Sequence, residues 1–81
     1  MTSDVIEKFV ESKDPNGKLT SIFFKQRSTI HGMFIQGRDY EEMKAKNFWR
    51  VVNESRLEEW KKTNDINLTR LFSGNDFAKL K

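Results

Sequence analysis

The chain contains one histidine, His31, which is the first residue to consider for catalysis. A histidine acts as a general base when a carboxylate orients its ring and a nucleophile lies within reach. The sequence neighbours of His31 are Ile30 and Gly32, and no acidic residue is close. Because catalysis needs a constellation of groups, we interpret His31 as a histidine on the face of a strand. We predict that the protein is not an enzyme.

The residue types of this chain give little support for a metal site or a phosphate-binding site. Without cysteine, a single histidine leaves only carboxylates as partners for a metal ion. The run DYEE at 39–42 groups Asp39, Glu41 and Glu42, but it lacks the alternating oxygen ligands and closing Glu of a calcium loop. The glycines form no phosphate-binding pattern. We expect these acids to occupy a solvated turn or a helix N-terminus, and we predict no metal and no cofactor.

A basic segment between residues 18 and 38 is the feature that could bind nucleic acid. It is free of acids, and its cations are Lys18, Lys25, Arg27 and Arg38. Such cations could meet phosphates while Phe23 or Phe34 stacks on a base. Phenylalanines in the middle of strands are more often core residues, and the net charge is only +3. Weak binding of RNA or single-stranded nucleic acid through this hairpin is therefore the alternative function.

Aromatic residues are the feature that favours protein association. The chain has seven Phe, two Trp and one Tyr among 81 residues. A chain this short buries only about 60% of its unfolded surface, so association would add stability, and interfaces favour aromatic side chains. Trp49 and Trp60 are the candidate interface residues, although each could equally fill the core. We predict an interaction module that associates with a protein partner or with itself.

Local patterns predict a helix at 3–12 and strands at about 18–26, 29–36 and 48–52. Ser3 can cap the helix, and its apolar stripe consists of Val5, Ile6, Phe9 and Val10. The sequence DPNG at 14–17 supplies a turn after it. The run QRS at 26–28 is the expected turn between the first two strands, and FWRVV at 48–52 is rich in aromatic and β-branched residues.

The C-terminal segment 55–81 is expected to be partly helical. SRLEEWKKTND (55–65) fits a helix capped by Ser55, with a strand as the alternative. In INLTRLF (66–72), the spacing of Leu68, Leu71 and Phe72 favours a helical turn, and FAKLK (77–81) could close the sheet as an edge strand. GRDYEEMKAKN (37–47) begins with a turn and has room for one helical turn.

Together these elements predict one α+β domain over residues 1–81. An N-terminal helix would pack on a small, strongly bent antiparallel sheet or a small barrel. The N-terminus shows neither a signal peptide nor a membrane span, and the absence of cysteine fits a reducing compartment. We therefore expect a cytoplasmic protein that does not contact a membrane.

Residues 21–34 resemble the first signature of the Sm-like family, most closely its bacterial RNA-chaperone branch. SIFF matches the first strand of that signature, and Ile30-His31-Gly32 matches its aliphatic-x-Gly element. The resemblance implies an SH3/Sm-like barrel with an N-terminal helix, assembly into rings, and binding of uridine-rich or adenine-rich RNA. Arg27 and Arg38 stand where the family has Gly and Asp, so no RNA-binding residue is carried over. The region from NFWRVV to NDFAKLK resembles small uncharacterised bacterial proteins.

Overall fold

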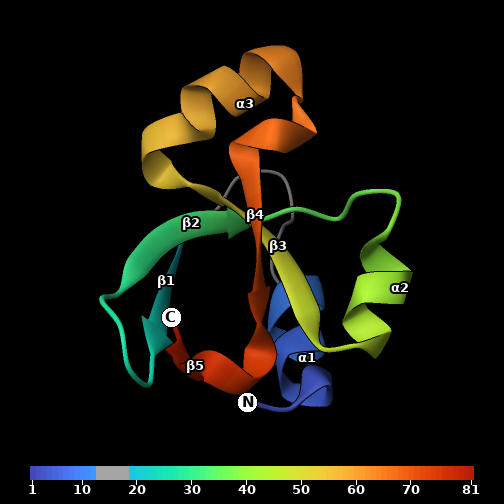
Figure 1. The fold of residues 1–81 in the computed structure, drawn as a ribbon, viewed down its shortest axis with the longest axis vertical. Helices are drawn as coiled ribbons and strands as arrows, with labels where there is room; N and C mark the ends of the chain where they lie inside the picture. Colours follow the sequence, from blue (N-terminus) through green and yellow to red (C-terminus); the bar gives the residue numbers. More distant parts are fainter. Residues whose placement is uncertain (13–18) are drawn as a thin grey trace.

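The computed structural model describes residues 1–12 and 19–81 and has an α+β fold (Figure 1). The helices are α1 (Ser3–Ser12), α2 (Tyr40–Ala45) and α3 (Leu57–Thr63), and the strands are β1 (Thr20–Phe24), β2 (Ile30–Phe34), β3 (Phe48–Asn53), β4 (Thr69–Ser73) and β5 (Phe77–Leu80). Short 3₁₀ helices η1 (Glu54–Arg56), η2 (Ile66–Leu68) and η3 (Gly74–Asp76) join the later elements. The predicted turn at 14–17 and the candidate residue Lys18 lie outside the described residues.

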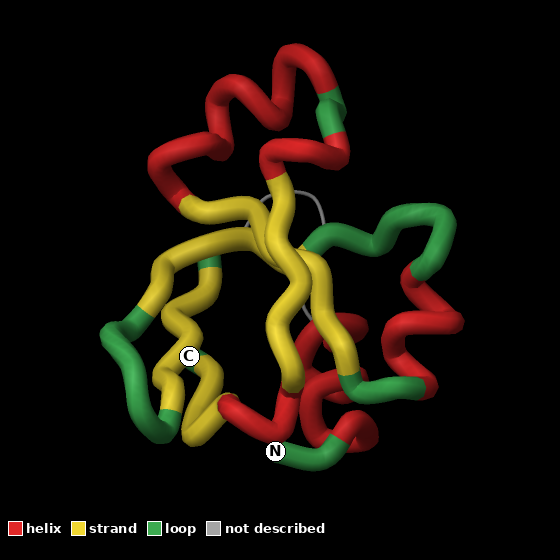
Figure 2. Tube along the Cα trace, in the orientation of Figure 1, coloured by secondary structure: helices red, strands yellow, loops and turns green. Residues whose placement is uncertain are grey.

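The strands form one antiparallel sheet in the order β4-β3-β2-β1-β5 (Figure 2). β1 and β2 pair as a hairpin, with Thr20 opposite Gly32 and Ile22 opposite Ile30. The sheet is not closed into a barrel, because β4 and β5 form its two edges. Of the two forms that the sequence predicts, the open, bent sheet is the one observed.

The bending of the sheet is visible in contacts between strands that are not neighbours. Two other strands separate β1 from β4, so a flat sheet would hold them about 14 Å apart. Instead, the rings of Phe24 on β1 and Phe72 on β4 have centroids 5.4 Å apart. The two sheet edges are also joined by η3, which has only three residues. The sheet therefore curls until its inner face encloses the core.

The core lies between this inner face and α1. Ile6 and Val10, two members of the apolar stripe predicted at 3–12, lie on the buried side of α1, whereas Val5 of the same stripe is 50% exposed. Ile6 and Val10 join a buried cluster from β1, β2, β3 and β5, against which the half-buried Phe72 of β4 packs; the other members of the cluster are Ile22, Phe24, Phe34, Trp49, Val51, Phe77 and Leu80. The rings of Phe34 and Trp49 meet edge to face at 6.3 Å, an arrangement that aromatic pairs prefer. The phenyl rings of the hairpin thus serve mainly to build the interior.

Several predicted boundaries differ from the observed ones. β1 and β2 are shorter than the predicted ranges 18–26 and 29–36, because the chain bends at 25–27 before the second strand. The helical turn expected at 66–72 is wrong over most of its length: only residues 66–68 are helical, and β4 begins at Thr69. β4 pairs in register with β3, so Leu71 and Phe72 lie on opposite faces of the sheet. Pairing with a neighbouring strand overrides the local helical spacing.

Candidate functional site

The basic residues of the hairpin lie in two separate places. Lys25 and Arg27 belong to the loop between β1 and β2, at the left of Figure 1, whereas Arg38 belongs to the loop between β2 and α2, at the right. The strand β2 lies between the two loops. The structure therefore places Lys25 and Arg27 on one loop and Arg38 on another.

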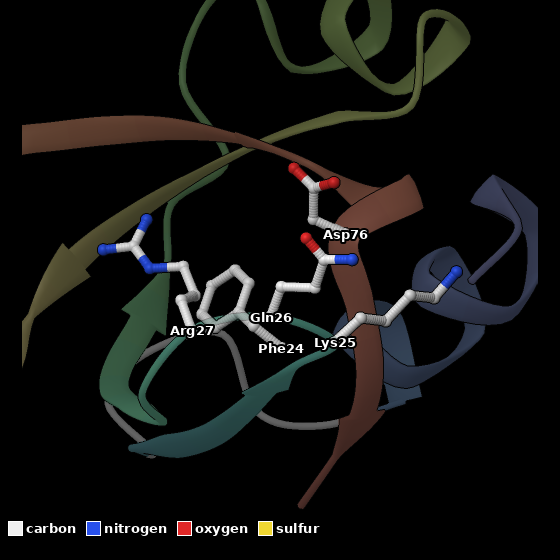
Figure 3. A pocket seen from close by; sticks show the side chains of 5 residues that line it. All are labelled: Phe24, Lys25, Gln26, Arg27 and Asp76. Atoms are coloured by element: carbon white, nitrogen blue, oxygen red, sulfur yellow. The ribbon is translucent and has the colours of Figure 1, made fainter.

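A surface cavity of about 330 Å³ lies beside the loop between β1 and β2. Its lining residues are Phe24, Lys25, Gln26, Arg27 and Asp76. In Figure 3, the guanidinium of Arg27 and the ammonium of Lys25 point to opposite sides of this cavity. The two charged groups therefore do not converge on one point where both could bind the same phosphate.

Arg27 belongs instead to an arginine–phenylalanine cluster, formed by Phe24, Arg27, Arg70 and Phe72. The Cζ atom of Arg27 lies 5.0 Å from the ring centroid of Phe24 and 5.4 Å from that of Phe72. Arg70, which lies two residues before Phe72 on β4, places its Cζ 5.9 Å from the same ring. These distances permit cation–π attraction. Two guanidinium groups therefore flank one half-buried phenyl ring.

The two candidate tryptophans have different environments. Trp49 is only 2% exposed and belongs to the core, and its indole Nε1–H donates to Asn47 Oδ1 at 2.8 Å. Trp60 is half-buried on α3. It lines an open cavity of about 500 Å³ with Gly37, Arg38, Asp39, Arg50, Asn64 and Ile66. Of the two, Trp60 is the one that reaches a surface cavity.

Arg50 ties the outer face of the sheet to the loop before α2. Its Nη2 donates to Asp39 Oδ2 at 2.7 Å, and its Nη1 donates to Thr69 Oγ1 at 2.9 Å. The hydrogen bond from Arg50 holds the pKa of Asp39 below its usual value, as expected for a carboxylate beside a guanidinium. This network fixes β3, β4 and the 37–39 loop relative to one another.

The remaining acids of the DYEE run also pair with cations. Glu41 lies 3.0 Å from Lys44 Nζ, and Glu42 lies 3.7 Å from Lys46 Nζ. Lys44 also contacts Glu7 of α1 at 2.8 Å. Each carboxylate of the run thus faces a different cation. Within the described ranges, no three acids and histidines are grouped as a metal site would require.

The contacts between α1 and α2 predict a loss of stability at high pH. Burial, together with the hydrogen bond from Tyr40 Oη to Glu11 (2.8 Å), raises the pKa of Tyr40. Hydrogen bonds to Glu7 and Glu41 raise the pKa of Lys44. Both groups titrate near pH 10 in an unfolded chain, so above about pH 10 the folded state holds more protons and the free energy of unfolding falls.

Tyr40→Phe tests this dependence by denaturant titration at neutral and alkaline pH. We expect the variant to be less stable than the wild type by about 1 kcal/mol at neutral pH, because it lacks the Glu11 hydrogen bond. The difference should narrow as the pH rises, since the variant has no phenol to ionise. A difference that stays constant across this range would contradict the role given to Tyr40.

His31 lies on an exposed strand face, as the sequence predicts. Its Nδ1 is 2.9 Å from the hydroxyl of Ser21, its cross-strand neighbour. The described residues give the ring no carboxylate partner, and His31 lines neither of the two cavities above. We interpret the contact between Ser21 and His31 as a structural hydrogen bond between the two strands of the hairpin.

Among the residues that the structure describes, no strand pairs with the side of β4 that faces away from β3, and the backbone direction at this edge can be deduced. Ile35 N–H donates to Arg50 O at 2.9 Å, so the backbone of Arg50 faces β2. Arg50 lies opposite Leu71. Because hydrogen-bonded and non-hydrogen-bonded pairs alternate in an antiparallel ladder, the N–H and C=O of Leu71 point away from β3. The same alternation turns the backbone of Thr69 and Ser73 to the open side.

Exposed apolar side chains accompany this edge. Leu71 is 45% exposed, and Phe48 on β3 is 39% exposed. The two lie on the same outer face, diagonally across the β3–β4 pair. We call the outward backbone of Thr69, Leu71 and Ser73, with the side chains of Leu71 and Phe48, the β4 edge surface.

The opposite edge of the sheet is built differently. β5 has four residues, and its register with β1 shifts between Phe23 and Phe24. Lys79 lies within β5 and Lys81 follows it. Short length, a bulge and lysines are features that discourage pairing with another strand. β4 pairs with β3 without a register shift and carries one charged residue, Arg70, so it is the less protected edge.

No family model, curated protein or solved structure matches this chain. In the described ranges, none of the helices combines the length and apolar character needed to cross a bilayer.

Proposed function

We propose that this protein is a non-enzymatic interaction module that associates through the β4 edge surface, with self-association included. The observation that carries the proposal is an unprotected edge strand whose free backbone groups lie beside exposed Leu71 and Phe48. Unpaired edge strands bind other strands through main-chain hydrogen bonds. The cytoplasm is the proposed location, because the chain contains no cysteine.

Leu71→Pro tests the proposal. Proline removes the outward N–H of residue 71, and an edge position tolerates this loss because that group makes no bond within the sheet. In sedimentation equilibrium up to high micromolar concentration, we expect the average mass of the wild type to rise. The variant should remain a monomer while circular dichroism shows that it is folded.

Two further variants separate backbone from side-chain effects. Leu71→Thr keeps the N–H and should weaken association without abolishing it. Val5→Thr removes a side chain that is 50% exposed on α1 and should leave association unchanged. A wild-type protein that is a strict monomer at the highest concentration would overturn the proposal of self-association.

A second candidate function rests on the arginine–phenylalanine cluster. Two guanidinium groups beside a half-buried ring could bind single-stranded RNA through its phosphates while a base contacts the ring. Arg38, which lies elsewhere, serves as the matched control.

This second candidate predicts different effects for the three arginines. We expect Arg27→Glu and Arg70→Glu each to weaken binding of a labelled single-stranded RNA by about tenfold at low salt. Arg38→Glu should change it little. Fluorescence anisotropy measures these affinities, and a flat titration of the wild type at low salt would remove the hypothesis.

A further inference from the structure

We infer that the partner of the β4 edge surface is a second copy of this chain, antiparallel to the first, with a two-fold axis at Leu71. This inference rests on the proposed function and adds the identity of the partner and the register. In this arrangement the partner's β4 extends the sheet, so the β3–β4 pairs of both copies become continuous.

The backbone directions restrict the possible registers. Only the outward groups of residues 69, 71 and 73 can form hydrogen-bonded pairs with a new strand. An axis at Leu71 places Leu71 opposite the partner's Leu71 and Thr69 opposite the partner's Ser73. The N–H and C=O of Leu71, the C=O of Thr69 and the N–H of Ser73 then find counterparts in the partner strand, whereas the N–H of Thr69 keeps its hydrogen bond to Ile66 O.

The charge on β4 favours the same register. An axis at Leu71 places Arg70 opposite the partner's Phe72. Shifting the register to place Thr69 opposite the partner's Leu71 would instead bring the two Arg70 side chains face to face, and like charges directly opposite each other are unfavourable.

The side chains on the outer face complete the contact. The two Leu71 side chains, each 45% exposed in the single chain, meet at the axis, and Phe48 of each copy lies one strand behind. A two-fold contact uses the same patch on both copies and closes as a dimer. Pairing of β4 with the partner's β5 would meet the bulge and the lysines at 79 and 81. The interface is small, so we expect a weak dimer.

Disulfide cross-linking tests the register, because the natural chain has no cysteine that could interfere. Directly opposed residues in a hydrogen-bonded pair have Cα atoms about 5.5 Å apart, within the range that a disulfide spans. With oxidised glutathione as the oxidant, we expect Leu71→Cys to form covalent dimers. Val5→Cys, at an exposed site on α1, should cross-link about tenfold less, because no interface raises its effective concentration.

A second pair of variants leaves Leu71 in place. Thr69→Cys loses the hydrogen bond from Arg50 Nη1, so circular dichroism must first show that it is folded. Thr69→Cys and Ser73→Cys should then cross-link when mixed with each other and not when either is oxidised alone. If the wild type associates in sedimentation but neither experiment yields these cross-links, or if the assembly is larger than a dimer, the two-fold arrangement is wrong while association stands. A monomeric wild type would overturn the proposed function itself.

Discussion

Replacing Gly32 with alanine is expected to lower the free energy of unfolding by about 2–3 kcal/mol, as for an overpacked core position. A Cβ atom at this residue would lie 2.6 Å from the carbonyl oxygen of Val52 and 2.8 Å from Cγ1 of Val51. The first contact is with the backbone of β3, which cannot move without disturbing the β2–β3 ladder. This close approach of β2 and β3 at residue 32 is part of the bending of the sheet around the core.

Gly37→Ala is the matched control for this measurement. A Cβ atom there would meet Asp39 Oδ1 at 3.6 Å, an ordinary van der Waals distance. We expect its free energy of unfolding to stay within about 0.5 kcal/mol of the wild type. Urea denaturation followed by fluorescence compares the two variants. Equal stabilities for Gly32→Ala and Gly37→Ala would show that β2 and β3 are not pressed together at residue 32.

The sequence predicts the first half of the fold well, because local patterns determine it. α1 occupies the predicted range Ser3–Ser12, since its apolar stripe has helical spacing and finds a sheet to cover. The hairpin of β1 and β2 follows from two apolar runs separated by a polar turn, and α3 follows from its helical spacing. Each of these elements is specified mainly by its own residues.

β4 could not be predicted in the same way, because its conformation depends on β3. The segment TRLFS shows no alternation of polar and apolar residues, and only the pairing of Trp49 with Phe72 and Arg50 with Leu71 makes it a strand. If residues 69–73 are assigned to a helix, Arg70 and Phe72 do not share a face. Leu71 then does not lie on a sheet edge where it could meet a partner. The β4 edge surface and the arginine–phenylalanine cluster could therefore be identified only from the structure.

The basic segment at 18–38 shows the opposite limit of prediction from sequence, because residues that are close in sequence can lie apart in the fold. Its cations are close in sequence, but β2 carries the chain from one side of the molecule to the other between Arg27 and Arg38. Charge spacing along a strand predicts a common face only for residues within that strand. Arg27 instead acquires Arg70, which is distant in sequence, as its neighbour across the Phe72 ring.

Asn47 is a further residue whose importance only long-range contacts disclose, and replacing it should have one of the largest effects in the chain. Its φ of 60° lies in the left-handed region, where most side chains other than those of Gly, Asn and Asp are strained. Its Oδ1 accepts the indole N–H of buried Trp49, and its carbonyl accepts from Gly74 N–H at 2.8 Å. It thereby fixes the start of β3 and the end of β4.

We expect Asn47→Ala to lower the free energy of unfolding by about 3 kcal/mol. About 1–2 kcal/mol of this comes from the left-handed backbone. The remainder comes from leaving the Trp49 N–H without an acceptor and from losing the hydrogen bonds of Asn47 Nδ2 to Met1 O and Asn75 Oδ1. Asn47→Gly relieves the backbone only, so it should be about 1 kcal/mol less harmful than the alanine variant. Asn47→Asp keeps the acceptor for Trp49 and the tolerance of positive φ, but it loses the hydrogen bonds from Nδ2 to Met1 O and Asn75 Oδ1. It should therefore be milder than the alanine variant but less stable than the wild type.

Asn64→Ala separates the two contributions, because Asn64 has a φ of 53° but is exposed at the end of α3. The free energy of unfolding of Asn64→Ala should fall only by the contribution of the left-handed backbone, about 1 kcal/mol. Denaturant titration followed by tryptophan fluorescence compares all four variants. If Asn47→Ala and Asn64→Ala lowered the free energy of unfolding equally, the side-chain hydrogen bonds of Asn47 would contribute nothing, and the anchoring of β4 at Asn47 would have to be abandoned. If the predicted order holds, Asn47→Asp is the variant in which β4 stays in place for the association measurements.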